Sequence, residues 1–93
     1  MRAIQSFSTQ VLAELIRRQP ASKERTRLAW QLAVGPALAR VTTVDLREGV
    51  LAVRCADQRW IPELTRARDV ILARIQQVLG SEVKRLAIAG AAD

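Results

Sequence analysis

Hydrophobic residues recur at helical spacing in the first twenty positions of the chain. A helix is predicted here, with Ser6 or Ser8 as a possible N-cap and with Pro20 ending it near Gln19. The apolar residues on its main stripe and beside it are Ile4, Phe7, Val11, Leu12, Leu15 and Ile16.

A second helix is predicted between Ser22 and Val34. The Ser22 hydroxyl can accept a hydrogen bond from a free backbone N–H of the first turn, and a Gly-Pro pair ends the helix. From Leu28 onward this segment is apolar on nearly all sides, so two of its faces must be covered. Trp30 is therefore predicted to lie in the core, with stacking on a nucleic-acid base as the alternative. Residues 37–39 are predicted as a short turn.

Two β-rich runs, residues 41–46 and 50–55, predict a hairpin. The three residues between them predict a loop with Gly49 at its positive-φ position. Alternation with a period of two sends Arg54 to the outer face and Cys55 to the inner face. Cys55 is predicted as a small core residue rather than a reactive thiol.

The third helix is predicted as one long element between an N-cap at Asp57 and a C-cap at Gly80. Pro62 falls in the first turn, where its missing N–H has no partner to lose. This segment has the strongest helical periodicity of the chain, so we expect its apolar side to cover a sheet. That side and its shoulder consist of Trp60, Ile61, Leu64, Ala67, Ile71, Leu72, Ile75, Val78 and Leu79.

A final strand is predicted over residues 83–88, followed by a frayed tail at residues 89–93. The elements then follow the order α-α-β-β-α-β, which predicts an α+β domain with helices packed on one face of a three-stranded sheet. No linker or internal repeat interrupts the sequence, so residues 1–93 are predicted to form a single domain.

The charge of the chain indicates an anionic or acidic partner. The sequence has 15 basic and 9 acidic residues, a net charge of +6, and 13 of the basic residues are arginine. Arginine suits phosphates and carboxylates, although a positive surface that only keeps a small domain soluble is the alternative interpretation.

The sequence lacks the residues that several classes of catalytic and ligand-binding sites require. There is one cysteine, no histidine and no glycine-rich phosphate-binding loop. We therefore predict that the protein is not an enzyme and takes no cofactor, no metal and no small-molecule substrate. No signal-peptide pattern or membrane-spanning apolar run is found, which predicts a cytoplasmic protein with no membrane partner.

Two groups of basic residues are candidate nucleic-acid contacts. The denser group bridges the first two predicted helices, and the smaller group lies along one edge of the third. The alternative is an ordinary solvated surface, in which the arginines that end the first helix serve only to cap it. The candidates are Arg17, Arg18, Lys23, Arg25 and Arg27 in the first group, and Arg66 and Arg74 in the second.

Trp60 is the candidate anchor for a protein partner. Its indole either closes the end of the core or stands partly exposed for a partner to contact. Arg59 and Glu63 complete this candidate protein-binding site. Arg68 falls among apolar positions and is assigned a structural role, with its charged end reaching solvent.

A set of residues from Trp30 onward has the spacing of a known family. The set is Trp30-x-x-x-Val34-Gly35, Leu46-x-x-Gly49-x-Leu51-x-Val53, Trp60-x-x-Glu63-Leu64, Ile71-Leu72 with Ile75, and Leu79-Gly80 before a closing strand. It resembles the DciA-like family, long catalogued as a domain of unknown function. The resemblance covers about residues 8–89, and its specificity lies in the two tryptophans spaced around the hairpin.

The resemblance implies a KH-like fold and the role of a bacterial replicative-helicase loader. Such an adaptor has no ATPase of its own, contacts the replicative DNA helicase, and binds single- or double-stranded DNA weakly and without sequence preference. Longer family members carry a flexible C-terminal extension, whereas this sequence ends at Asp93, so a function housed there is expected to be absent or altered.

Two other functions are open at this point. The first is a stand-alone KH-like domain that binds RNA or the ribosome, although the GxxG loop of true KH domains is missing from this sequence. The second is a purely structural oligomerisation module.

Overall fold

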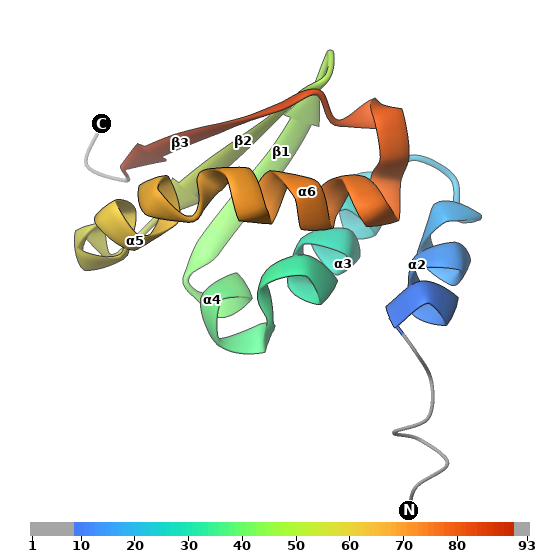
Figure 1. Cartoon of the computed structure of the whole chain (residues 1–93), viewed down its shortest axis with the longest axis horizontal. Helices are drawn as coiled ribbons and strands as arrows, with labels where there is room; N and C mark the ends of the chain where they lie inside the picture. Colours follow the sequence, from blue (N-terminus) through green and yellow to red (C-terminus); the bar gives the residue numbers. More distant parts are fainter. Residues whose placement is uncertain (1–8, 91–93) are drawn as a thin grey trace, which may run out of the picture.

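This computed structural model describes residues 9–90. They form a three-stranded sheet with helices on one face (Figure 1). The strands are β1 (Thr42–Arg47), β2 (Val50–Cys55) and β3 (Arg85–Gly90), in the order β1-β2-β3. β1 pairs antiparallel with β2, and β3 pairs parallel with β2. The predicted α+β class and the order of its elements are confirmed.

Five α-helices lie on the inner side of the sheet in the described range. They are α2 (Thr9–Arg17), α3 (Lys23–Val34), α4 (Pro36–Arg40), α5 (Ile61–Arg66) and α6 (Arg68–Leu79), and the turns η1 (Gln58–Trp60) and η2 (Gly80–Glu82) are short 3₁₀ segments. Ser22 caps α3 as predicted, because its Oγ accepts a hydrogen bond of 3.1 Å from the Arg25 N–H. The turn predicted at residues 37–39 is instead the short helix α4, which starts at a proline whose fixed φ suits a helix.

The hairpin turn is one residue shorter than predicted. Arg47 pairs with Val50, so only Glu48 and Gly49 connect β1 to β2. Their φ angles are 52° and 85°. Positive φ at both positions is typical of two-residue hairpins, because this turn matches the twist of the strands.

The long third helix is two helices separated at Ala67, where φ is −92° and ψ is 7°. Asp57 therefore caps η1 instead of a long helix. α5 packs against β3, whereas α6 packs mainly against α3 and α2. The predicted apolar side continues across the break, since Leu64, Ile71 and Ile75 are all buried. Because α5 and α6 have separate axes, the apolar residues of α5 can pack against β3 while those of α6 pack against α3 and α2.

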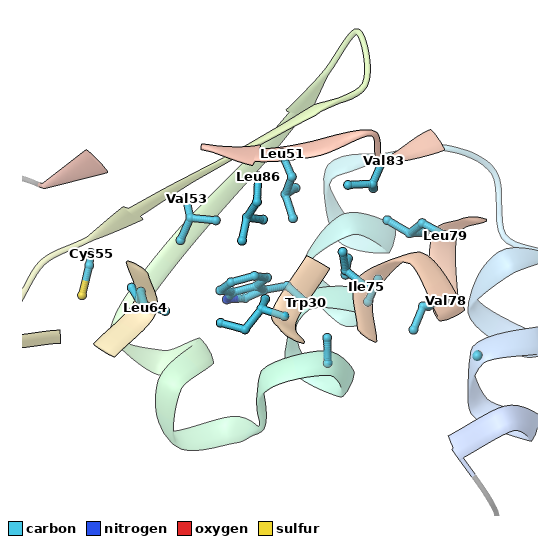
Figure 2. Close-up of a cluster of buried hydrophobic side chains, with 14 residues drawn as sticks. Trp30, Leu51, Val53, Cys55, Leu64, Ile75, Val78, Leu79, Val83 and Leu86 are labelled. Atoms are coloured by element: carbon cyan, nitrogen blue, oxygen red, sulfur yellow. The ribbon is translucent and has the colours of Figure 1, made fainter. Parts of the chain in front are cut away.

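The hydrophobic core lies between the inner face of the sheet and the helices (Figure 2). The inward positions predicted for β2 are confirmed, and Cys55 is fully buried with its Sγ donating to the Asp57 carbonyl at 3.1 Å. In Figure 2 the indole of Trp30 lies beneath the strands, between Leu64 and Ile75. The largest fully buried side chains are Trp30, Leu51, Leu64, Ile75, Val53, Val78, Val83 and Cys55.

The first helix presents a different face from the one predicted. Val11, Leu12 and Leu15 are exposed, while Ala13 is buried. α2 is turned so that a small residue meets the core and Arg17 reaches α6. Ile16, predicted beside the stripe, is partly buried and packs against the core. The remaining apolar residues and the predicted N-caps lie outside the described residues: Ile4, Phe7, Ser6 and Ser8.

β3 extends two residues beyond the predicted end of the last strand. Ala89 and Gly90, assigned to a frayed tail, pair with Arg54 and Cys55 of β2. Residues 91–93 lie outside the described residues. None of the helices between residues 9 and 90 is long and apolar enough to cross a membrane.

Candidate functional site

Arg17, a candidate nucleic-acid contact, lies at the C-terminal end of α6. Its Nε donates to the Val78 carbonyl at 3.1 Å, and its Nη2 donates to the Gln77 carbonyl at 3.2 Å. These carbonyls belong to the last turn of a helix, where free oxygens carry the negative end of the helix dipole. Arg17 thus joins α2 to α6 with two of its donors.

Arg25 is buried, with a fractional exposure of 5%. Its Nη2 forms an ion pair with Glu82, and its Nη1 donates to the carbonyls of Arg17 and Gln19 at 3.3 and 3.4 Å. A buried guanidinium needs such partners because its desolvation is costly. Arg25 therefore holds the end of α2 and the η2 turn against α3.

The other candidate nucleic-acid contacts are exposed. Arg66 lies 3.5 Å from Glu63 in an ion pair on α5. For the remaining four, no ion pair or side-chain hydrogen bond is found within residues 9–90. Lys23 and Arg27 lie on α3 and Arg74 lies on α6, so these candidates come from different helices. The four exposed residues are Arg18, Lys23, Arg27 and Arg74.

A groove lies along the edge strand β1, between it and the helices α3 and α4. It consists of two hollows of about 560 and 330 Å³ that share Val44 in their linings. Arg27 lines the larger hollow and Lys23 the smaller one. Arg40 and Arg47 also line the groove, and sequence reasoning missed both, because no local pattern shows which helix lies beside β1.

The base of the groove is fixed by a chain of hydrogen bonds. The Trp30 indole Nε1 donates to Thr42 Oγ1 at 2.8 Å, and Thr42 Oγ1 donates to the Leu38 carbonyl at 2.8 Å. Trp30 is 2% exposed. The predicted core position of this tryptophan is confirmed, and its ring is not accessible to a nucleic-acid base.

Trp60 lies in η1, between the end of β2 and the start of α5, and is 37% exposed. The prediction for this residue left core and exposed positions open, and the structure shows a partly exposed indole. Arg59 and Glu63, the other candidate protein contacts, are exposed as well. Each of these two residues takes part in an ion pair.

The ion pair beside Trp60 perturbs two groups. Arg59 Nη2 lies 2.8 Å from Asp57 Oδ2, and the Arg59 backbone N–H donates to Asp57 Oδ1 at 3.0 Å. The side-chain hydrogen bond from Arg59, followed by the backbone one, lowers the pKa of Asp57 below its usual value of 3.8. The pKa of the Arg59 guanidinium is raised, chiefly by the same hydrogen bond.

Metal chemistry has no candidate within the described part of the chain. No three His, Cys, Asp or Glu side chains there gather in a way that suits a metal ion. Arg68 is exposed at the first position of α6, and it lines a third hollow beside Leu72 and β3.

Comparison with known proteins identifies the family. A family model described as "Dna[CI] antecedent, DciA" matches residues 3–88 of the 93-residue chain. The search for curated relatives gave no match. The family implies a role in bacterial DNA replication as a helicase loader, and it is not known as a family of enzymes. Because the matched range includes all the described helices, β1, β2 and most of β3, this chain belongs to the DciA family.

Proposed function

We propose that this protein is a non-enzymatic adaptor of bacterial DNA replication. In this proposal it binds the replicative helicase through the surface around Trp60, and it binds DNA weakly through its unpaired cations. The single observation that carries the helicase contact is a tryptophan left 37% exposed in a chain whose other described aromatic residue is buried. A cytoplasmic location follows from this role.

The surroundings of Trp60 suit a protein contact. Tryptophan and arginine are the residues most enriched at the energetic centres of protein interfaces. Here the indole offers apolar area, and the pairs Asp57–Arg59 and Glu63–Arg66 lie within six residues of it in the chain. Exposed ion pairs of this kind contribute little to stability, so they are free to exchange partners in a complex.

The unpaired cations support DNA binding that does not depend on sequence. Arg18, Lys23, Arg27 and Arg74 are exposed on three segments of the chain, which suits contacts with phosphates rather than with base edges. Trp30 is buried and unavailable for stacking. Affinity that depends on phosphates alone falls steeply with salt concentration.

The helicase contact is tested with a Trp60→Ala variant and the purified replicative helicase. We expect binding to weaken by about tenfold or more, because tryptophan anchors typically cost 2 kcal/mol or more when truncated. Leu28→Ala is the matched control, since Leu28 is a large apolar residue on α3 that is 50% exposed. Circular dichroism verifies that both variants are folded. Unchanged affinity of a folded Trp60→Ala variant contradicts this proposal.

DNA binding is tested by measuring the dissociation constant of two unrelated oligonucleotide sequences over a range of salt concentrations. We expect equal affinities for the two sequences. Replacing Arg18 and Arg74 by glutamine is expected to reduce the slope of log affinity against log salt by about 1.4 to 1.8, since each phosphate contact contributes about 0.7 to 0.9. RNA bound more tightly than DNA of the same sequence supports the alternative of an RNA-binding domain.

A further inference from the structure

β1 is an edge strand whose outer side is unpaired within residues 9–90. The Ala56 N–H donates to the Val41 carbonyl at 3.1 Å, just before the first paired residues Thr42 and Cys55. Hydrogen-bonded and non-hydrogen-bonded pairs alternate along an antiparallel ladder. The backbone N–H and C=O groups of Thr42, Val44 and Leu46 therefore point away from β2.

The groove described above follows this free edge along most of β1. Its larger hollow is lined by Thr42, Thr43 and Val44, and its smaller hollow continues from Val44 to Arg47. α3 forms the opposite wall, together with α4 at the larger hollow. A groove between an edge strand and a helix is the site where PDZ domains bind an extended peptide by strand addition.

The groove carries an excess of positive charge. The two acidic residues in its lining already have partners, since Glu82 pairs with Arg25 and Asp45 pairs with Arg47. Three cations in the lining have no ion pair among the described side chains. They are Lys23, Arg27 and Arg40.

The backbone of β1 favours a peptide over a nucleic acid as the occupant. Its free edge offers C=O acceptors as well as N–H donors, repeated about every 6.8 Å, which is the spacing of two residues in a strand. An extended peptide matches both kinds of group, whereas phosphates only accept hydrogen bonds. The aromatic residue in the lining, Trp30, is buried and its N–H is already bonded, so bases have no surface to stack on there.

We propose that the groove between α3 and β1 binds an acidic peptide segment in extended conformation, as a fourth strand beside β1. Carboxylates at alternate positions of the peptide face Lys23, Arg27 and Arg40, because side chains of a strand point to the same face every second residue. This site lies outside the Trp60 surface and goes beyond the proposed helicase contact. Because it uses Lys23 and Arg27 of the proposed DNA contacts, peptide and DNA compete for these two residues.

The test uses a fluorescently labelled eight-residue peptide in which glutamate alternates with threonine, and the full chain of the protein. We expect it to bind, and the peptide with lysine in place of glutamate to show no binding. Two further peptides carry N-methyl groups on the odd or on the even residues. Strand addition predicts that one of these loses binding and that the other keeps it, because only every second N–H faces β1. Equal binding of both methylated peptides overturns strand addition.

Matched variants locate the site. Arg27→Gln combined with Arg40→Gln is expected to weaken peptide binding roughly tenfold or more. The variant loses hydrogen bonds between guanidinium and carboxylate groups, which are stronger than those between neutral groups. Arg68→Gln combined with Arg85→Gln changes the net charge equally beside the third hollow, where both residues are exposed, and is expected to bind as the natural protein does. Equal losses in the two double variants overturn the assignment to the groove.

Two more measurements separate this proposal from its alternatives. Val44→Pro removes a backbone N–H of the free edge without breaking the β1–β2 ladder, so a folded variant is expected to lose the peptide. Trp60→Ala is expected to keep it, which makes this site independent of the helicase contact. An oligothymidylate that binds through Arg27 and Arg40, while the acidic peptide shows no binding, overturns the proposal and assigns the groove to nucleic acid.

Discussion

Trp30 and Thr42 are joined by a hydrogen bond of 2.8 Å from the indole Nε1 to the hydroxyl Oγ1, which ties α3 to the first residue of β1. The same hydroxyl donates to the Leu38 carbonyl of α4. Because Trp30 is almost completely buried, its N–H has no access to water. One hydroxyl thus holds two helices and an edge strand in the arrangement that forms the groove.

A Thr42→Val substitution tests this bond. Valine keeps the branched shape that suits a strand but leaves the Trp30 N–H without an acceptor. We expect the free energy of unfolding to fall by about 1–3 kcal/mol, the cost of an unsatisfied buried polar group. Urea denaturation measures this change. Thr43→Val is the control, because Thr43 is exposed and a surface change of this kind stays within about 0.5 kcal/mol. Equal effects of the two substitutions contradict the role given to the bond.

Arg25 and Arg27 are neighbours on α3 with different environments, and they make a matched pair. Arg25→Met removes the ion pair with Glu82 and the hydrogen bonds to two backbone carbonyls. We therefore expect the free energy of unfolding to fall by about 1–3 kcal/mol. Arg27→Met changes an exposed side chain and is expected to cost less than about 0.5 kcal/mol. Thermal and urea unfolding measure both. A stable Arg25→Met variant contradicts the structural role of the buried guanidinium.

Asp57 gives the protein a pH dependence at the acid end. Its pKa is lower in the folded protein than in the unfolded chain, so the ionised carboxylate stabilises the fold. This contribution is complete above pH about 4, and it is lost as the pH falls through the lowered pKa. NMR titration is expected to show the pKa of Asp57 below 3.8, and Arg59→Gln is expected to return it toward that value. In an Asp57→Asn variant the side-chain oxygen can cap η1 at every pH. The stability of this variant is therefore expected to fall less steeply in acid than that of the natural protein.

Cys55 provides a direct measure of core opening. Its thiol is fully buried, and its sulfur donates to the Asp57 carbonyl. We expect a thiol reagent such as Ellman's reagent to react with the native protein only at the rate at which the fold opens, and at the full rate in urea. Immediate reaction of the native protein shows that the β2 end of the core is open.

Local patterns in the sequence predicted the elements that depend on local chemistry. Ser22 and Gly35 mark the two ends of α3 as predicted, because helix caps bond to backbone groups only a few residues away in the chain. The inward positions of β2 followed from alternation alone, and Trp30 was placed correctly from its apolar surroundings. The family resemblance, based on spacings across the whole chain, was confirmed by the family match.

The features that the sequence did not reveal depend on contacts between distant segments. Arg17 and Arg25 belong to a basic run that resembles an exposed cluster, yet their partners lie about sixty positions later in the chain. The break at Ala67 follows from the different neighbours of α5 and α6. The groove exists only because α3 lies beside β1, so Arg40 could not be assigned to it from its own surroundings in the sequence.

The position of β3 in the sheet has a consequence for how the protein is made. This strand is the last of the described elements along the chain, yet it pairs with the central strand, where Leu86 lies opposite Leu51. During translation the core therefore cannot close until β3 has left the ribosome. The nascent chain exposes its apolar core residues up to that moment, and such exposed surface is prone to aggregation.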